Sequence, residues 1–140
     1  MTVSNLMAGE TWPSLALEAW SDTYATLHLW TQIVGKIRLA QTPWTNHSWH
    51  VTLYVTPRGL TTGSIPYGSN AFQIDFDFVE HELRIQRDRG GAAGFPLRRQ
   101  SVAEFYRRLK DEMERLDLKV RIHPKPNEIA NPIPFEQDEV

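Results

Sequence analysis

The sequence predicts an α+β fold in which two main helices pack on the apolar face of an antiparallel sheet of four to five strands. Three observations support this fold. An apolar stripe with helical spacing comes first, segments with two-residue alternation follow, and a capped helix precedes a last short strand. The order helix, strands, helix, strand suggests that both helices cover one face of the sheet.

Length and composition are those of an ordinary folded domain. The chain has 140 residues, of which 41% are hydrophobic and 23% are charged, so one core is sufficient. Its net charge of -2 gives no overall field that favours nucleic acid. The chain contains no cysteine, which excludes disulfides and thiolate metal sites. With no leader peptide and no apolar span evident, we expect a soluble cytoplasmic protein.

The first helix is expected to begin at Thr11-Trp12-Pro13-Ser14, because proline favours the first turn, and to end near Ala40. Its apolar residues recur at steps of three or four and are assigned to the core. They are Leu17, Trp20, Tyr24, Leu27, Trp30, Val34 and Ile37. In an alternative interpretation, Asp22 and Thr23 cap a second helix, and the segment is divided into a short helix and a longer one.

Four segments are then expected to form strands. Residues 49–55 alternate, with Trp49, Val51, Leu53 and Val55 on the core side. Residues 60–67 contain Gly63 and Pro66 and predict a short or irregular strand. Residues 72–78 alternate most clearly and predict the central strand, with Phe72, Ile74, Phe76 and Phe78 facing the core. A tight turn at Glu80-His81 leads to the fourth strand, through Leu83 and Ile85.

The second helix has the clearest start signal in the chain. Residues 88–94 form a glycine-rich loop before it, and Ser101-Val102-Ala103-Glu104 matches a capping box. The helix is expected to end at Asp117, and a final strand follows through Leu118, Val120 and Ile122. Four prolines after residue 123 predict an extended arm without regular structure. We therefore expect one domain at 1–123 and an arm at 124–140.

Several segments resemble an uncharacterised bacterial family known only as a domain of unknown function. They are residues 27–40, 46–49, 53–55, 58–62, 74–78, 101–106 and 134–135, which together extend over nearly the whole chain. Members of that family continue into a second half of similar size, so the resemblance implies that this chain corresponds to the N-terminal half. The resemblance does not indicate which activity or cofactor the chain has, if any.

Asp75 and Asp77 are the main candidates for catalysis. They are two residues apart on the central strand, so their carboxylates project from one face, roughly 7 Å apart. Such a pair could bind a divalent cation or act as acid and base, with His50 or His81 transferring protons. Alternating polar residues are also ordinary on a solvated sheet face. Enzymatic chemistry is therefore kept as the alternative function, and the identity of any metal stays open.

A second group of residues suggests ligand binding. His28, Gln32 and Lys36 follow one another at steps of four along the first helix, and Arg58 and Tyr54 could supply further polar contacts. The leading interpretation is a binding or assembly module that binds a small ligand or self-associates through its polar sheet face. The expected partner is a second copy or a missing second half. Trp12, Trp44 and Trp49 suggest an aromatic rim for it.

Overall fold

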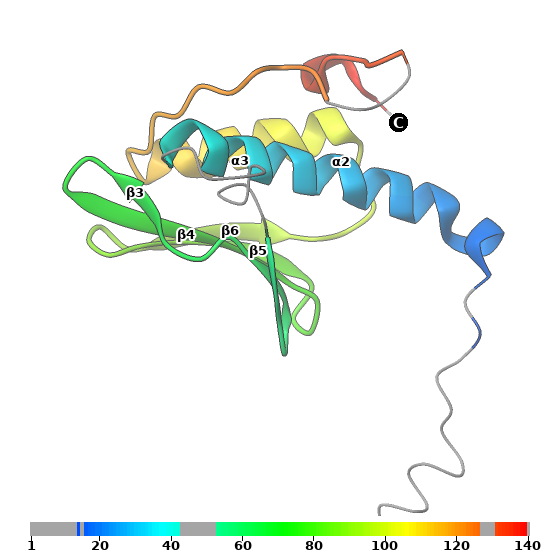
Figure 1. The fold of residues 1–140 in the computed structure, drawn as a ribbon, viewed down its shortest axis with the longest axis horizontal. Coiled ribbons are helices and arrows are strands. Elements are labelled where there is room, and N and C mark those ends of the chain that lie inside the picture. The colour runs from blue at the N-terminus through cyan, green and yellow to red at the C-terminus, as the bar shows by residue number, and fades with distance from the viewer. Residues whose placement is uncertain (1–13, 15, 43–52, 127–130, 140) are drawn as a thin grey trace, which may run out of the picture.

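The computed structural model describes residues 14, 16–42, 53–126 and 131–139. Two helices cover one face of an antiparallel sheet, and the C-terminal segment runs over the outer side of the helices (Figure 1). The helices are α2 (Leu17–Gln41) and α3 (Val102–Arg115), and the strands are β1 (Tyr54–Thr56), β2 (Gly59–Thr61), β3 (Ile65–Tyr67), β4 (Asn70–Asp77), β5 (Glu82–Arg87) and β6 (Ala92–Pro96). The α+β prediction is confirmed, with six described strands instead of four or five.

The central position predicted for residues 72–78 is confirmed. Strand β4 pairs with β5 along its length from Phe72 to Asp77, and on its other side it pairs with both β2 and β3. The predicted irregularity of residues 60–67 is also found, because the segment is divided between β2 and β3. At the interruption Thr62 uses its Oγ1 to accept a hydrogen bond from the Ile74 N–H at 3.1 Å.

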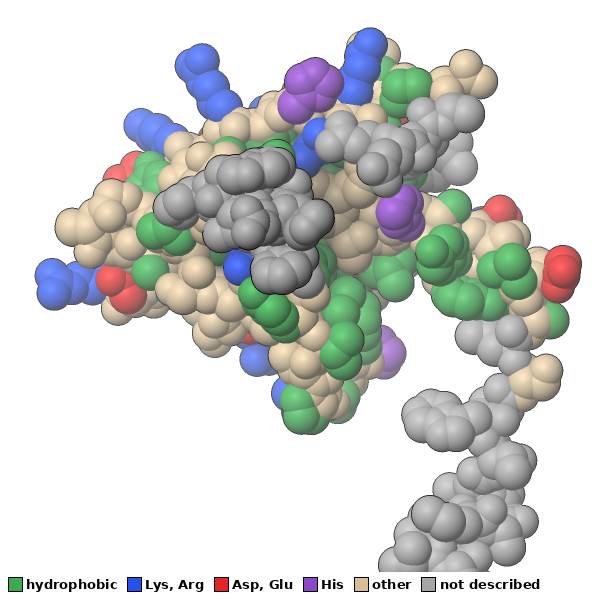
Figure 2. Space-filling model, in the orientation of Figure 1, with side chains coloured by type: hydrophobic (Ala, Val, Ile, Leu, Met, Phe, Trp, Pro, Cys, Tyr) green, Lys and Arg blue, Asp and Glu red, His purple; other side chains and the backbone are tan. Residues whose placement is uncertain are grey.

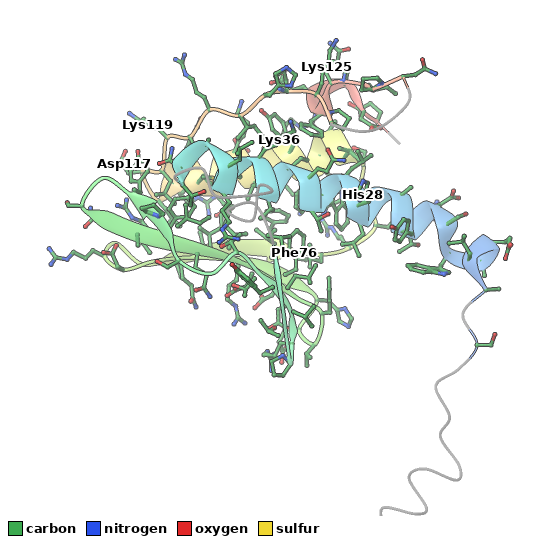
Figure 3. All side chains as sticks on the ribbon, in the orientation of Figure 1. His28, Lys36, Phe76, Asp117, Lys119 and Lys125 are labelled. Carbon is green, nitrogen blue, oxygen red and sulfur yellow. The ribbon has the colours of Figure 1, made fainter. Side chains whose placement is uncertain are left out.

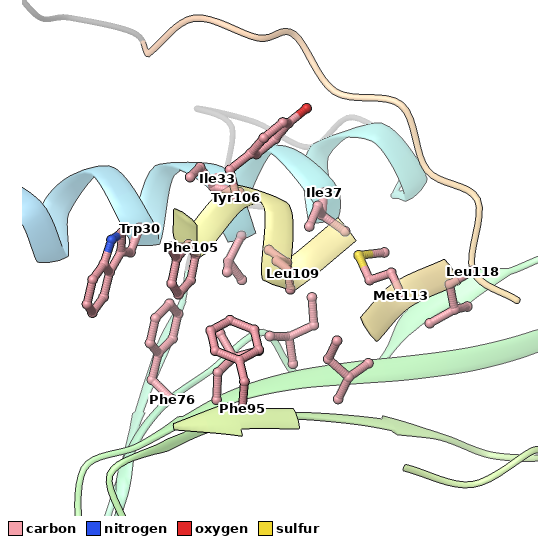
Figure 4. Close-up of a cluster of buried hydrophobic side chains, with 14 of the residues drawn as sticks. Trp30, Ile33, Ile37, Phe76, Phe95, Phe105, Tyr106, Leu109, Met113 and Leu118 are labelled. Carbon is pink, nitrogen blue, oxygen red and sulfur yellow. The ribbon is translucent and has the colours of Figure 1, made fainter. Parts of the chain in front are cut away.

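The core lies between the sheet and the two helices (Figure 4). The Phe105 ring of α3 is at its centre, stacked on Trp30 of α2 at 4.8 Å and on Phe76 of β4 at 6.1 Å between ring centroids. Phe95 of β6 meets Phe105 edge-on at 5.4 Å. These aromatic contacts join α2, α3, β4 and β6 into one packed unit.

The start of α3 confirms one half of the predicted capping box. Ser101 Oγ accepts a hydrogen bond from the Glu104 N–H at 3.1 Å, but the Glu104 carboxylate pairs with Arg108 at 3.0 Å. A second N–H of this turn, that of Ala103, donates to the Asp138 carbonyl at 2.7 Å. The C-terminal segment therefore helps to cap α3.

The C-terminal arm is packed on the domain, and the prediction that it lacks regular structure is wrong at one place. Residues Phe135–Gln137 form a 3-10 turn, η2. The Phe135 ring is fully buried and lies 5.8 Å from the Tyr106 ring of α3. Prolines disfavour a long helix or strand here, but the buried Phe135 ring and the hydrogen bond from the Ala103 N–H to the Asp138 carbonyl hold the segment on the domain.

Two strand predictions are wrong. Residues 118–122 form no strand, although Leu118 is buried and contributes to the core. A strand was missed at Ala92–Pro96, where the sequence suggested only a glycine-rich loop. Gly94 allows this pairing, because a Cβ at that position would lie 2.3 Å from the Leu83 carbonyl oxygen.

The structure also differs from the predictions at the start of α2 and in the exposure of two residues assigned to the core. Helix α2 is continuous, which excludes the division at Asp22, and its N-cap is Ala16 instead of a residue in the Trp12-Pro13-Ser14 segment. Val55 and Phe78, both assigned to the core, are 85% and 40% exposed. Val55 lies on β1, which forms with β2 a hairpin that bends away from the helix layer (Figure 1). In the described part of the chain, neither helix is long and apolar enough to cross a membrane.

Candidate functional site

The candidate site lies on the face of the sheet that the helices leave open. Strand β4 directs Gln73, Asp75 and Asp77 to this face, opposite the buried Phe72, Ile74 and Phe76. A hollow of about 150 Å³ is present there. Its lining residues are Thr56, Arg58, Thr61, Gln73, Asp75, Phe76, Asp77 and Arg84.

Asp77 has a structural position at one end of this hollow. Its Oδ1 accepts hydrogen bonds from the Val79 and Glu80 N–H groups, both at 2.9 Å, and its Oδ2 accepts one from Arg58 Nε at 2.8 Å. The hydrogen bond from Arg58, followed by the one from the Glu80 backbone, lowers the Asp77 pKa to about 2. Asp77 therefore stays ionised near neutral pH and fixes the turn between β4 and β5.

Asp75 has a different environment from Asp77. It is partly buried, and both of its oxygens accept hydrogen bonds from Gln73 Nε2, at 3.0 and 3.1 Å. The sheet register places Thr61 on one side of it and Arg84 on the other. No ion pair joins Asp75 to a basic residue among those that the structure describes. Its described side-chain hydrogen-bond partner is therefore the uncharged amide of Gln73.

Two arginines border the hollow and are already bound to carboxylates. Besides its contact with Asp77, Arg58 places Nη2 at 3.4 Å from Glu80 Oε1, and the Asp77 hydrogen bond raises the Arg58 pKa. Arg84 donates from Nε to Glu82 at 2.8 Å and also pairs with it through Nη2, which lies 3.9 Å from Asp77. The side chains of Arg58 and Arg84 are 50% and 40% exposed, so both still reach solvent.

The remaining predicted ligand-binding residues lie away from this hollow. Figure 3 shows His28 and Lys36 on α2, in the layer on the other side of the sheet. His28 Nε2 is 3.1 Å from Gln32 Nε2. Lys36 is buried, and this burial lowers its pKa. Tyr54 accepts a hydrogen bond from Arg38 Nη2 at 3.3 Å, and the Arg38 guanidinium also lies over its ring. Only Arg58 of this predicted group joins the hollow.

The predicted histidines add little to the site. His50 lies outside the described residues, as do Trp12, Trp44 and Trp49. His81 is exposed in the turn after β4 and adopts a positive φ of 54°. No group of three His, Cys, Asp or Glu side chains suited to a metal ion occurs within the described residues. The aspartates consequently have no described histidine or acidic partner that would complete a metal site.

Arg84, Gln73 and Thr61 were not predicted as site residues. A signal for Arg84 exists in the sequence, because a tight turn after Asp77 places it opposite Asp75 in an antiparallel pair. The position of Thr61 could not be predicted in the same way. The chain is interrupted between β2 and β3, so the two-residue alternation does not continue from one strand to the other.

Comparison with known proteins gives a family but no function. Residues 12–140 match the model of a family of unknown function (DUF5996), and the chain belongs to that family. No curated protein and no solved structure matches the chain.

Proposed function

We propose that this member of the DUF5996 family is a small-ligand binding module, and that the hollow on its open sheet face receives a small molecule bearing an ammonium group. The observation that carries the proposal is the state of Asp75, which lines the hollow and has no ion pair in the described structure. A partly buried carboxylate without a cationic partner favours a ligand that supplies one.

The charges around the hollow support a cationic or zwitterionic ligand more than an anion. The carboxylates of Asp77, Glu80 and Glu82 already outnumber Arg58 and Arg84, and Asp75 adds to this excess of negative charge. The exposed parts of the two guanidinium groups could still bind a carboxylate on the same ligand. At about 150 Å³ the hollow is smaller than the roughly 300–1,000 Å³ of drug-sized sites. The best-fitting class is therefore a small amino acid or a similar zwitterion.

The test is a thermal-shift and calorimetric comparison of glycine and β-alanine with acetate, inorganic phosphate and putrescine. A ligand at about 100 times its Kd stabilises the native state by about 2.7 kcal/mol, which raises the Tm by several degrees. Asp75→Asn should remove the shift, and Asp111→Asn, the same change at an exposed position of α3, should keep it. A response to acetate or phosphate that survives in Asp75→Asn would contradict the proposal.

Metal-assisted or acid/base chemistry with Asp75, Asp77 and His50 or His81 has less support. Asp77 is the reason, because its hydrogen bonds to Arg58 and to the turn stabilise the charged form that a general acid must neutralise. Calorimetric titration with Mn²⁺ or Zn²⁺ separates the alternatives. Binding that is lost in the Asp75→Asn, Asp77→Asn double variant would favour the enzyme.

Three broader expectations belong to the same proposal. The cytoplasmic location follows from the lack of cysteine. The bacterial distribution of the family and the position of this chain as an N-terminal half follow from the resemblance described above. A longer family member whose second half covers the open sheet face would make the hollow an interdomain site.

A further inference from the structure

The N-terminal half of α2 extends beyond the rest of the domain. No residue of α2 before Trp30 is buried, and Leu17 and Tyr24 are 59% and 52% exposed. Figure 1 shows these turns passing the end of the sheet and of α3, and Figure 2 shows hydrophobic side chains gathered on them. We call residues 17–29 the overhang. It contains an aromatic ladder in which Trp20 meets Tyr24 edge-on at 5.2 Å and Tyr24 stacks on His28 at 6.3 Å.

A helical segment as short as the overhang gains little stability from its own backbone hydrogen bonds. Isolated helices shorter than about 12–15 residues are marginal in water, and most helical stability in proteins comes from packing an apolar face. Exposed aromatic and aliphatic side chains that follow one another on a helix are typical of an interaction surface. Leu27 and Leu29, at the end of the overhang, pack against the core. The turns before them have the composition of a helix that packs against a surface, yet none of their described side chains is buried.

The place where the overhang leaves the domain contains buried polar atoms without partners. Trp30 Nε1 is one, and both amide atoms of Gln100 are others, with Gln100 only 8% exposed. Trp30 stacks on Phe105 in the first turns of α3, and Gln100 immediately precedes the N-cap Ser101. Buried polar groups in native proteins nearly always have a hydrogen-bond partner. These buried atoms are out of reach of a partner, so the second surface is the exposed part of the loop before α3, at Arg98 and Arg99.

The two surfaces carry opposite charges. The overhang contains Glu18 and Asp22, and the loop between β6 and α3 contains Arg98 and Arg99, both exposed. None of these four side chains forms an ion pair with another described residue. One chain therefore carries both an acidic apolar helix and a basic surface that could receive it.

We propose that a second copy of this chain occupies these surfaces in a two-fold dimer. In this arrangement each overhang lies against the start of the partner's α3, with Trp20 and Tyr24 at the centre and the acidic residues beside Arg98 and Arg99 of the other copy. A two-fold axis makes the contact occur twice, which doubles the area that one helix could bury. The interface is separate from the hollow on the open sheet face, so it does not depend on the proposed ligand.

Light scattering and sedimentation measure the expected state directly. The wild-type chain should have a dimeric mass at about 100 μM and dissociate on dilution, as mass action requires. Trp20→Glu should raise the dimer dissociation constant by at least about 30-fold, as for the loss of an aromatic anchor. Val55→Glu is the matched control, because Val55 is 85% exposed on β1, outside the proposed interface. Circular dichroism should show that both variants stay folded.

Charge exchange identifies the partner as a second copy. Glu18→Arg with Asp22→Arg should give a monomer, and so should Arg98→Glu with Arg99→Glu, because each variant places like charges together. A mixture of the two double variants should form a heterodimer, since both contacts are then complementary, and the quadruple variant should dimerise with itself.

Three results would overturn the proposal. A monomeric wild-type chain at about 100 μM would remove the second copy. A dimer that Trp20→Glu leaves unchanged would place the interface elsewhere. Double variants that fail to form a heterodimer when mixed would show that the overhang and the basic loop do not meet.

Discussion

The two halves of α2 differ in burial more than in residue type. The C-terminal half buries Trp30, Ile33 and even Lys36, whereas the N-terminal half exposes Leu17 and Tyr24. The difference lies in what each half faces. The C-terminal half packs against α3 and β3, and the N-terminal half extends past them. Burial along this helix follows its neighbours in space more closely than its own sequence pattern.

The largest expected effect concerns the aromatic contacts beneath the packed half of α2. Phe76→Ala removes a ring that is 1% exposed and stacked on Phe105, and should lower the free energy of unfolding by about 3–5 kcal/mol. Phe78→Ala also removes a phenyl ring, but Phe78 follows β4 and is 40% exposed. This variant should therefore lower the free energy of unfolding by clearly less. Urea denaturation measures both. A loss below about 1 kcal/mol for Phe76→Ala would contradict this view of the core.

The second-largest expected effect is the difference in stability loss between the C-terminal and the N-terminal half of α2. Ile33 is fully buried, so Ile33→Ala should destabilise the chain by about 2–5 kcal/mol through lost burial and a cavity. Leu17→Ala should change stability by no more than about 0.5 kcal/mol in the monomer, because Leu17 is 59% exposed. Both are measured by urea denaturation at a concentration low enough to avoid self-association. Equal losses would mean that the overhang packs on its own domain.

A smaller effect is expected at the start of α2, which lacks a capping side chain. Ala16 is the N-cap and supplies no side-chain hydrogen bond. Ala16→Asp should stabilise the first turn by about 0.5–1 kcal/mol and slow its amide exchange about two- to fivefold. In contrast, Ser101→Ala should destabilise α3 by about 1 kcal/mol, because the existing cap is lost. Hydrogen exchange that is unchanged by Ala16→Asp would show that the overhang is already held in place.

The smallest expected effect is a pH dependence confined to the packed half. Burial lowers the pKa of Lys36, so near its unfolded pKa the unfolded chain binds more protons than the folded one. Stability from this group therefore rises as pH increases from the lowered pKa toward 10.5. Wild-type stability should increase relative to Lys36→Met as the pH is raised toward 10.5. A difference that is constant over this range would show that Lys36 has the same pKa in both states.

The candidate site could be predicted only in part. The two-residue spacing of Asp75 and Asp77 on one strand predicts that they share a face, and they do. The spacing could not show that Asp77 is committed to Arg58 and the following turn, because that depends on a residue 19 positions away. Arg84 joins the hollow through strand pairing, which alternation within one strand does not specify.

By itself, the sequence determined the elements whose signals are local. The alternation of Phe72, Ile74 and Phe76 and the Ser101 cap each depend on residues a few positions apart, and both predictions are confirmed. Only the tertiary structure decided which apolar residues become core. The stripe of α2 is one continuous pattern, yet the layer beneath it ends, so Tyr24 lies in water while Ile33 is buried. Periodicity specifies which side chains share a face, but burial also requires a surface opposite that face, supplied by segments distant in the sequence.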